Sequence, residues 1–578
     1  MAGPTAPKDP EKARPFFYIL KDKDIFGERQ KDGTGIQFIY ESDGRLINSA
    51  QITGNVTDKE ELRLLETVEG FGRLVHSIGV SVETDRPEET AEFVFQMYGK
   101  KDLYGGGTNL TTSLKCDGME HRIYLSDYRW TEDDHVPGQI KILFAAPERM
   151  GKVSVRLFLN DGYEAPPEEE DLVIDMHSEE YCGMISRSLL QLGNPYRIRK
   201  AIEKSKAGKE VTLAYIGGSI TQGAGAIPIH TECYAYKSFQ LFQNRFSTQN
   251  NVRFIKAGVG GTPSELGMIR FDRDVLREGE RPDIVVIEFA VNDEGDETKG
   301  VCYESLVRKV LKLPWKPAVV LLFSVFANDW NLQERLRPVG DLYDLPMVSI
   351  RDAVTQQFSL KCGEGRILSK NQFFYDIFHP NNTGHTIMAD CLQYLFERCD
   401  AAEPARVGTF VEGMTEEQIL SEKLSGPAVI GADFERIFLL DKKNRYVGAK
   451  IRAGGFTSTD IELQSVEMDG NLTQTPEFPY NWMYDGSRPQ MPGFEMEITC
   501  KSLFLIFKDS GEMDVGKANV FVNDVYCMTA DPHKNNWLHC NAVLLFWETE
   551  SRSHKVRIAV TEEDRNKKFT ILGFGYTI

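Results

Sequence analysis

The sequence lacks any apolar run long enough to cross a bilayer, and its first residues, MAGPTAPKDPEKARPFF, lack the apolar segment of a secretory leader. We therefore expect a protein that is neither embedded in a membrane nor exported by that route. Removal of a leader before the first residue would leave the same sequence, so this alternative stays open.

A basic excess is missing as well. The 578 residues include 67 Lys and Arg against 86 Asp and Glu, and the formal net charge is −19. Binding to nucleic-acid phosphates requires clustered Lys and Arg. We therefore expect no nucleic-acid partner and little attraction to anionic membrane surfaces.

Paired cysteines are also absent. The ten cysteines form no CxxC pair, and none has a histidine at the spacing of a zinc site. This scatter indicates reduced, mostly buried thiols. It predicts no bound metal and favours a cytoplasmic location.

The chain is too long for a single core, and its strand patterns predict three units. Residues 1–185 contain short β-rich segments such as AEFVFQMYG and KVSVRLFLND between turn residues, which is typical of an antiparallel β-sandwich. The segment DLVIDMHS (171–178) has the composition of one further strand. Residues 403–578 return to this pattern, so we predict a second, jelly-roll-like β-sandwich that is a candidate for carbohydrate binding.

Residues 186–402 instead alternate between apolar strands and helical segments. The stretch from Asn194 to Glu210 predicts a helix, with Asn194 as its N-cap, Pro195 in the first turn and Gly208 near its end. The apolar runs that follow, from VTLAYI to AVVLLFSVF, are typical of buried parallel strands. The predicted fold class is therefore a three-layer α/β domain flanked by two β-sandwiches.

One serine stands at a position suited to catalysis. In VTLAYIGGSITQGAG (211–225) the apolar run stops at Gly217 and Gly218, and Ser219 then opens a segment able to start a helix, with Thr221 as its candidate cap. A serine at such a turn stands above the carboxyl end of a parallel sheet, where its hydroxyl and backbone N–H can face one substrate. An ordinary strand-to-helix turn that contains serine is the alternative.

A glycine-rich turn follows the second strand of this unit. In KAGVGGTPSELG, Gly258, Gly260 and Gly261 let the backbone approach a ligand and direct N–H groups into a cleft. Pro263 stands where a dinucleotide-binding GxGxxG motif has its third glycine, which excludes that motif. A bare turn without a ligand is the alternative for this stretch.

Polar residues also close the third strand and precede the last helix. The stretch EFAVNDEGD places Asn292 and Asp293 at the same sheet edge as the serine, where an asparagine amide can stabilise a developing oxyanion or merely cap a turn. In FFYDIFHPNNTGHTIMAD, Asp376 lies three residues before His379 and can fix the tautomer that a general base needs. His385 and Asp390 lie within the following helix and fit this role less well.

Together these four blocks resemble the SGNH subgroup of the GDSL hydrolases, whose blocks are a GDS-type serine, a glycine, a GxND asparagine and a DxxH pair. The resemblance covers about Asn194 to Cys399. Gly218 replaces the aspartate of GDS and Ala290 replaces the first glycine of GxND, but neither change removes a reacting group. The GxSxG elbow of α/β-hydrolases is excluded, because Thr221 occupies its last position.

The resemblance implies a flavodoxin-like sheet, with Ser219 as the nucleophile, His379 as the base and Asp376 as its orienting partner. It also implies an oxyanion hole made of the backbone N–H groups of Ser219 and Gly261 and the side-chain amide of Asn292. Acyl transfer through this set requires no metal and no cofactor.

The GGSITQG form, together with flanking sandwiches, is similar to carbohydrate O-acetylesterases. The expected substrate is therefore an acetylated xylo- or manno-oligosaccharide, and Trp330, Trp482 and Tyr484 are candidates to stack on its sugar rings, with packing between domains as their alternative function. A lipid or thioester acylhydrolase and a non-catalytic glycan-binding protein are the competing hypotheses. The sequence leaves a homo-oligomer open.

Overall fold

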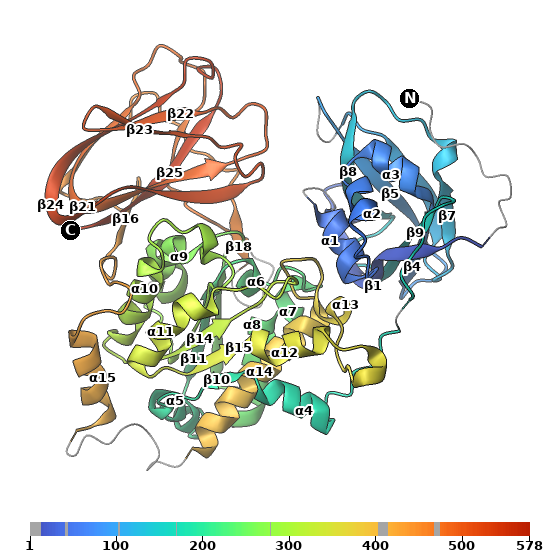
Figure 1. The fold of residues 1–578 in the computed structure, drawn as a ribbon. Helices are drawn as coiled ribbons and strands as arrows, with labels where there is room; N and C mark the ends of the chain where they lie inside the picture. The colour runs from blue at the N-terminus through green and yellow to red at the C-terminus, as the bar shows by residue number, and fades with distance from the viewer. Residues whose placement is uncertain are drawn as a thin grey trace.

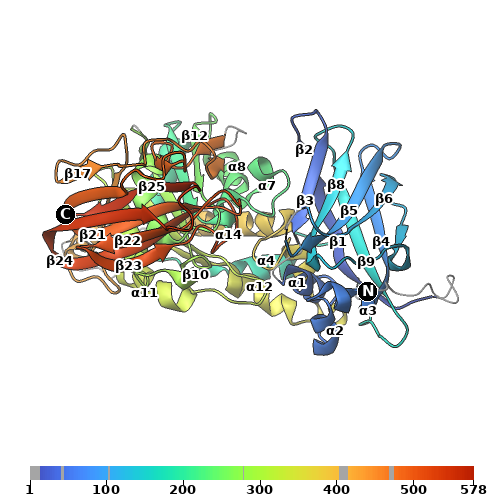
Figure 2. The ribbon, with the colours of Figure 1, turned by 90° about the horizontal axis from the view of Figure 1, so that it is seen from above.

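The structure is a computed structural model that describes residues 13–40, 44–101, 105–168, 170–277, 279–402, 414–467 and 474–578. These residues form three units, each built around its own sheets. In Figures 1 and 2 the N-terminal unit and the C-terminal unit lie on either side of the central α/β unit and make contact with it.

The N-terminal unit is the expected antiparallel β-sandwich. Its sheets have the strand orders β1-β9-β4-β7 and β2-β3-β8-β5-β6, and one apolar core lies within the unit. The elements are β1 (Phe16–Phe26), β2 (Glu28–Arg29), β3 (Gly35–Tyr40), α1 (Arg45–Ile52), α2 (Lys59–Leu64), α3 (Val68–Leu74), β4 (Val75–Thr84), β5 (Thr90–Gly99), β6 (Asn109–Lys115), β7 (His121–Tyr124), β8 (Asp134–Phe144) and β9 (Met150–Leu159).

Two features of this unit differ from the prediction. The helices α1, α2 and α3 interrupt the β pattern, and the last two are capped by the side chains of Asp58 and Thr67. The segment 171–178 forms no strand. Val173 in it is 98% exposed, while the Asp171 carboxylate instead pairs with Arg366 of the central unit.

The central unit is built on a six-stranded sheet of order β10-β15-β14-β13-β11-β12, in which only the short edge strand β10 is antiparallel. Numbered from β11, the parallel strands follow the order 2-1-3-4-5 of flavodoxin-like folds. The elements are α4 (Glu179–Ser186), β10 (Leu189–Gln191), α5 (Tyr196–Lys206), β11 (Val211–Gly217), α6 (Ser219–Gln222), α7 (Ile229–Glu232), α8 (Tyr234–Phe246), β12 (Val252–Gly258), α9 (Ser264–Phe271), β13 (Ile284–Glu288), α10 (Val301–Leu311), β14 (Ala318–Phe323), α11 (Gln333–Tyr343), β15 (Met347–Ser349), α12 (Ile350–Phe358), α13 (Lys370–Phe373), α14 (Asn382–Ala401) and α15 (Glu416–Ser425).

Every residue of β11, β13 and β14 is buried, because helices cover both faces of the sheet. One core contains α5, α8, α12 and α14, and the other contains α9, α10 and α11. The predicted helix is present as α5, but it is shorter than expected and its N-cap position is Pro195, not Asn194. The Asn194 side chain accepts a hydrogen bond from the Tyr196 N–H at 3.0 Å, just before the helix. The expected three-layer α/β fold is therefore confirmed.

The C-terminal unit contains an eight-stranded antiparallel sheet with an apolar core, and β18 and β19 form a separate two-stranded sheet. The elements are β16 (Phe438–Leu440), β17 (Ala449–Arg452), β18 (Ser465–Glu467), β19 (Gln474–Pro476), β20 (Trp482–Tyr484), β21 (Phe494–Asp509), β22 (Ala518–Val522), β23 (Val525–Ala530), β24 (His539–Val560) and β25 (Phe569–Thr577). The two-residue repeat of β21 divides its side chains between two cores. Leu503 and Leu505 face the unit's own core, whereas Phe504 and Ile506 join α9 and α10, so the sheet docks on the central unit through an apolar face.

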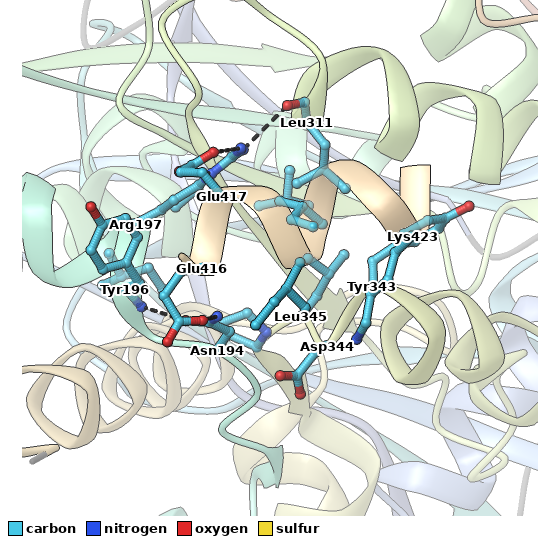
Figure 3. A pocket seen from close by; sticks show the side chains of 16 residues that line it. Asn194, Tyr196, Arg197, Leu311, Tyr343, Asp344, Leu345, Glu416, Glu417 and Lys423 are labelled. Atoms are coloured by element: carbon cyan, nitrogen blue, oxygen red, sulfur yellow. Dashed lines mark hydrogen bonds and ion pairs between the residues drawn. The ribbon is translucent and has the colours of Figure 1, made fainter. Parts of the chain in front are cut away.

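The helix α15 follows the predicted domain boundary at residue 402 but packs on the central unit. Arg197 of α5 forms hydrogen bonds at 3.1 and 2.8 Å to the Glu417 carboxylate of α15. These residues line a pocket of about 40 Å³ under the helix (Figure 3), which is too small to hold a sugar ring. We regard this pocket as a packing defect between helices.

Candidate active site

The serine is presented by a sharp turn at the carboxyl end of β11. The strand ends at Gly217, Gly218 adopts φ −86° and ψ −145°, and α6 begins at Ser219 itself. A methyl group on Gly218 would lie 2.2 Å from the Asn292 Oδ1 atom, so the aspartate of a GDS motif would require Asn292 to move. Asn292 therefore packs closely against this turn.

Thr221 does not cap a helix, contrary to the prediction. It lies within α6, fully buried, where its Oγ1 donates to Glu288 Oε2 at 3.0 Å and lies 2.8 Å from the Tyr234 hydroxyl. Burial raises the pKa of Glu288 to about 7, against the opposing effect of the Thr221 hydrogen bond. This polar network fixes the short helix that begins with Ser219.

The fold brings together three side chains that resembled a triad in the sequence. His379 Nε2 lies 3.0 Å from Ser219 Oγ, and His379 Nδ1 lies 3.0 Å from both carboxylate oxygens of Asp376. The Asp376 carboxylate also accepts from the backbone N–H groups of Phe378 at 2.8 Å and His379 at 2.9 Å. The imidazole is thus held between an acceptor and a hydroxyl, as a general base for serine requires.

The same contacts keep Asp376 ionised. Burial alone would raise the pKa of this carboxyl, but the charge and hydrogen bond of His379, the charge of Arg45 and the Phe378 N–H lower it to about 2. Arg45 belongs to α1 of the N-terminal unit. Lys23 of β1 likewise donates to the Phe374 carbonyl, just before this loop. The N-terminal sandwich therefore supports the loop that carries Asp376 and His379.

The three candidate oxyanion donors also converge near Ser219. Gly260 lies close to the serine, because a Cβ added to it would be 4.0 Å from the Ser219 Cβ. The neighbouring Gly261 has a φ of +70°, a conformation that favours glycine. Asn292 follows β13 and lies against Gly218, and its Oδ1 is buried without a hydrogen-bond partner among the described residues. Gly261 and Asn292 therefore lie beside the Ser219 turn, and their role as oxyanion donors stays a prediction.

Asp293 has a structural task that differs from that of its neighbour. It is fully buried, and its Oδ1 accepts from the Ser264 N–H at 2.7 Å, at the start of α9. Burial raises the pKa of Asp293 to about 8, although the Ser264 hydrogen bond opposes this change. Asp293 therefore anchors α9, and only Asn292 of the pair lies beside the serine turn.

His385 has a structural role as well. It is fully buried in α14, where its Nδ1 lies 3.1 Å from the Tyr234 N–H and its Nε2 lies 3.1 Å from the Ala224 carbonyl. Burial lowers the pKa of His385 to about 3, so the ring stays neutral. It ties α14 to the loop after α6, as expected for a histidine that is not the base.

The aromatic candidates fall into two groups. Trp330 stacks on Phe326 at 5.7 Å, Phe326 contacts Phe378 at 5.1 Å, and Phe378 lies 6.1 Å from the His379 ring, all measured between centroids. The three rings make an aromatic wall beside His379 (the Phe326–Trp330–Phe378 wall), and Phe378 is 37% exposed.

Trp482 and Tyr484 are not part of this wall. Each is only 5% exposed, and both lie in the core of the C-terminal unit, where Trp482 packs against Phe494 and Phe574. A buried ring has no face left for a sugar. The proposed sugar-stacking role of these two residues is therefore wrong. They do pack in a core, but within the C-terminal unit rather than between domains.

Sequence reasoning missed three residues of the C-terminal unit that touch the glycine-rich turn. Gln464 donates from Nε2 to the Gly260 carbonyl at 2.9 Å, and His539 Nε2 lies 3.1 Å from the Gly261 carbonyl. The ring of Trp537 packs over the Gly261 Cα, where an added Cβ would be 2.8 Å away. No motif surrounds these residues, and only the docking of the C-terminal sheet brings them to the site.

Neither a metal cluster nor a membrane helix occurs in the described part of the chain. No group of three or more His, Cys, Asp and Glu side chains is arranged to hold a metal ion there. Among the same residues, no helix combines the length and the apolar character needed to cross a bilayer.

Comparison with known proteins identifies the central domain. Residues 215–387 match the model of the GDSL-like Lipase/Acylhydrolase family. The structure is similar to that of a two-domain esterase (CEX) active on acetylated mannans, with TM-score 0.54 and 23% identity, covering 68% of this chain and 98% of that one. The same esterase co-crystallized with mannopentaose matches with TM-score 0.53, 23% identity and the same coverage, 68% and 98%.

No curated protein sequence matches the chain. At 23% identity the likeness to the two-domain esterase concerns the fold, whereas the family match concerns the sequence of the domain that contains Ser219 and His379. The expectation of an enzyme of the hydrolase class is thereby confirmed. Residues 215–387 of the central unit are thus similar in sequence to the GDSL-like Lipase/Acylhydrolase family.

Proposed function

We propose that this protein is a serine esterase that removes O-acetyl groups from plant-type oligosaccharides through an acyl-enzyme on Ser219. The observation that carries this proposal is the continuous contact from Ser219 Oγ to His379 Nε2 at 3.0 Å and from His379 Nδ1 to Asp376 at 3.0 Å. This is the arrangement in which a histidine can accept the serine proton while a carboxylate stabilises the resulting cation.

The reaction proceeds in two halves. His379 takes the Ser219 proton as Oγ attacks the acetyl carbonyl carbon, and the N–H groups of Ser219 and Gly261 with the Asn292 amide stabilise the oxyanion. Collapse of the intermediate breaks the ester C–O bond, and the proton passes from His379 to the departing sugar hydroxyl. Water then attacks the acetyl-serine while His379 accepts its proton, and acetate leaves as Ser219 is reprotonated.

Two features support a carbohydrate as the alcohol part of the ester. The wall of Phe326, Trp330 and Phe378 borders His379, and exposed aromatic faces suit the apolar faces of sugar rings. The fold is shared with an esterase active on acetylated mannans, of which a complex with mannopentaose exists. We therefore propose acetylated manno- or xylo-oligosaccharides as substrates.

The thiols favour a reducing compartment. None of the ten cysteines, all of which lie among the described residues, forms a disulfide, and seven of them are buried: Cys116, Cys233, Cys302, Cys391, Cys399, Cys500 and Cys540. Proteins of oxidising compartments usually pair such residues. We therefore propose a cytoplasmic enzyme that acts on soluble oligosaccharides.

The test is acetate release from acetylated manno- and xylo-oligosaccharides, with long-chain acyl esters in parallel, for the native protein and Ser219→Ala. Ser502→Ala serves as the control, because Ser502 is a buried serine of the C-terminal unit that contacts Thr577 and not the site. Release of acetate that Ser219→Ala abolishes and Ser502→Ala retains supports the proposal. Turnover of long acyl chains alone would indicate a lipid esterase, and the absence of Ser219-dependent turnover would indicate a glycan-binding protein.

A further inference from the structure

The glycine-rich turn after β12 has few contacts of its own. Within it, the Thr262 Oγ1 donates to the Val259 carbonyl at 2.8 Å, and the Val259 N–H donates to the Gly217 carbonyl at 3.2 Å. Gly260 and Gly261 between them have no side chains to hold them, and glycine loses more conformational freedom on ordering than any other residue. The Thr262 N–H also donates to the Val259 carbonyl, but at 3.4 Å this closing bond is long. The orientation of the two peptides therefore also depends on contacts from outside the turn.

The C-terminal unit makes both contacts that set this orientation. Gln464 Nε2 donates to the Gly260 carbonyl at 2.9 Å, and His539 Nε2 lies 3.1 Å from the Gly261 carbonyl. In a trans peptide the C=O of one residue and the N–H of the next are coplanar and point in opposite directions. The bond from Gln464 to Gly260 thus determines the direction of the Gly261 N–H, which is the proposed oxyanion donor.

Each of these two side chains is itself fixed. The Gln464 Oε1 accepts from the Cys540 N–H at 3.0 Å, so the amide can present only its NH₂ group to Gly260. His539 Nδ1 lies 3.0 Å from Asp509 Oδ2, and Asp509 is fully buried. Gln464 is 9% exposed and His539 is 6% exposed, so water competes little for these bonds.

The platform that carries them is rigid. The sheet of the C-terminal unit shares an apolar core with α9 and α10 through Phe504, Ile506 and Leu572. Side chains in such a core are close-packed, so the elements that share the core can move little relative to one another. The distance between the C-terminal unit and the glycine turn is therefore set by packing on the helix that directly follows the turn.

We propose that Gln464 and His539 are positioning residues of the oxyanion hole, so that the C-terminal sandwich completes the active site of the central domain. The inference rests on the proposed esterase function and deepens it. Neither side chain touches the reacting atoms. Gln464 orients the Gly261 N–H. It also polarises the amide to which this N–H belongs, because hydrogen bonds in series strengthen one another. His539 holds the next peptide, through the Gly261 carbonyl.

The test uses a small substrate, 4-nitrophenyl acetate, which makes no sugar contacts. In Gln464→Glu the carboxylate still accepts from Cys540 but faces Gly260 with an oxygen in place of the amide donor. In His539→Leu the donor to Gly261 is lost, whereas His539→Gln can place its amide nitrogen near the position of Nε2. Ser502→Ala is the control, and thermal unfolding of each variant reports whether it folds.

We expect Gln464→Glu and His539→Leu to lower kcat about 10- to 100-fold, because a displaced donor weakens transition-state stabilisation. KM should stay within about twofold of the native value, since ground-state binding does not use the oxyanion hole. His539→Gln should recover most of the kcat lost in His539→Leu, which a role in folding alone would not predict.

Two results would overturn the inference, and they are distinguishable. If the native protein and Ser502→Ala hydrolyse the ester and both Gln464→Glu and His539→Leu match them within about twofold in kcat, only the positioning role fails. If even the native protein shows no hydrolysis that depends on Ser219, the proposed function fails and the positioning role fails with it.

Discussion

Replacement of Asp376 by asparagine separates the orienting role of this residue from its role in the fold. The backbone contacts survive the change, because in Asp376→Asn the Oδ1 atom can still accept from the Phe378 and His379 N–H groups, which lie 2.8 and 2.9 Å away in the native protein. The second side-chain atom, however, becomes an NH₂ donor opposite His379 Nδ1. Only Oδ1, 3.0 Å from Nδ1, is left to accept from the ring, and it already accepts from two backbone N–H groups. When the NH₂ group donates to Nδ1 instead, the ring carries its proton on Nε2, which faces Ser219 Oγ and then cannot take the serine proton.

The expected loss is large. In serine triads a change of this kind lowers kcat by about 10⁴, or about 5 kcal/mol of transition-state stabilisation. In the resting enzyme the pKa of Asp376 is lowered from 3.8 to about 2, so the carboxyl is ionised at neutral pH. The loss of kcat arises in the transition state, where the neutral asparagine no longer stabilises the charge that develops on the imidazole.

The assay is kcat for 4-nitrophenyl acetate and for the best acetylated oligosaccharide. Asp390→Asn is a matched control, because Asp390 lies in α14 and accepts from the Tyr181 hydroxyl, away from His379. We expect the control to keep its activity. If Asp376→Asn retains kcat within about tenfold of the native protein, the assignment of Asp376 as the orienting carboxylate is refuted.

The remaining predictions concern a buried carboxyl and two tryptophans. The pKa of Glu288 is raised from 4.5 to about 7, so its stabilising contribution is present below pH 4.5 and is lost as the pH rises to about 7. The unfolding free energy of Glu288→Gln, relative to that of the native protein, should therefore rise by about 3 kcal/mol from pH 5 to pH 8. Denaturant unfolding of both proteins measures this difference, and an equal pH dependence of their unfolding free energies would contradict the prediction. Trp330→Ala should raise KM for acetylated oligosaccharides but leave KM for 4-nitrophenyl acetate unchanged. Trp547→Ala, at a half-exposed tryptophan, is the control. An equal effect of Trp330→Ala on both substrates would argue against a sugar contact. Trp482→Ala should lower the free energy of unfolding by about 3–5 kcal/mol, measured by denaturant unfolding, without a change in KM. A change in KM in a variant that stays stable would support a contact between Trp482 and the substrate.

Local patterns were sufficient for the central domain. Its strands are buried on both faces and therefore appear as continuous apolar runs, and the residues that leave those strands at the carboxyl edge are bound to meet at one end of a parallel sheet. That is why Ser219 and Asn292, which follow β11 and β13, can be assigned to one edge from the sequence. His379, 160 positions after Ser219, follows no strand and was assigned through the DxxH block before the last helix. The existence of the helix after Asn194 was equally predictable, but its first residue and its cap position were each misplaced by one residue, since Pro195 occupies the N-cap.

Features that depend on contacts between distant segments were not predictable in this way. Thr221 has the side chain of a helix cap, but the turn at Gly218 starts the helix earlier and directs Thr221 to the buried Glu288. Trp482 has the composition of an exposed loop aromatic, yet β20 pairs with β25 and places the ring in a core.

The sequence by itself determined which residues have the chemistry of acyl transfer and that they gather at one sheet edge, because strand direction and turn chemistry are local properties. Only the tertiary structure decided that both sandwiches contact the site. Lys23 reaches the loop before Asp376, and Gln464 and His539 reach the glycine turn. Such contacts depend on how separately folded units dock, and docking depends on the shape of apolar surfaces that no short stretch of sequence encodes.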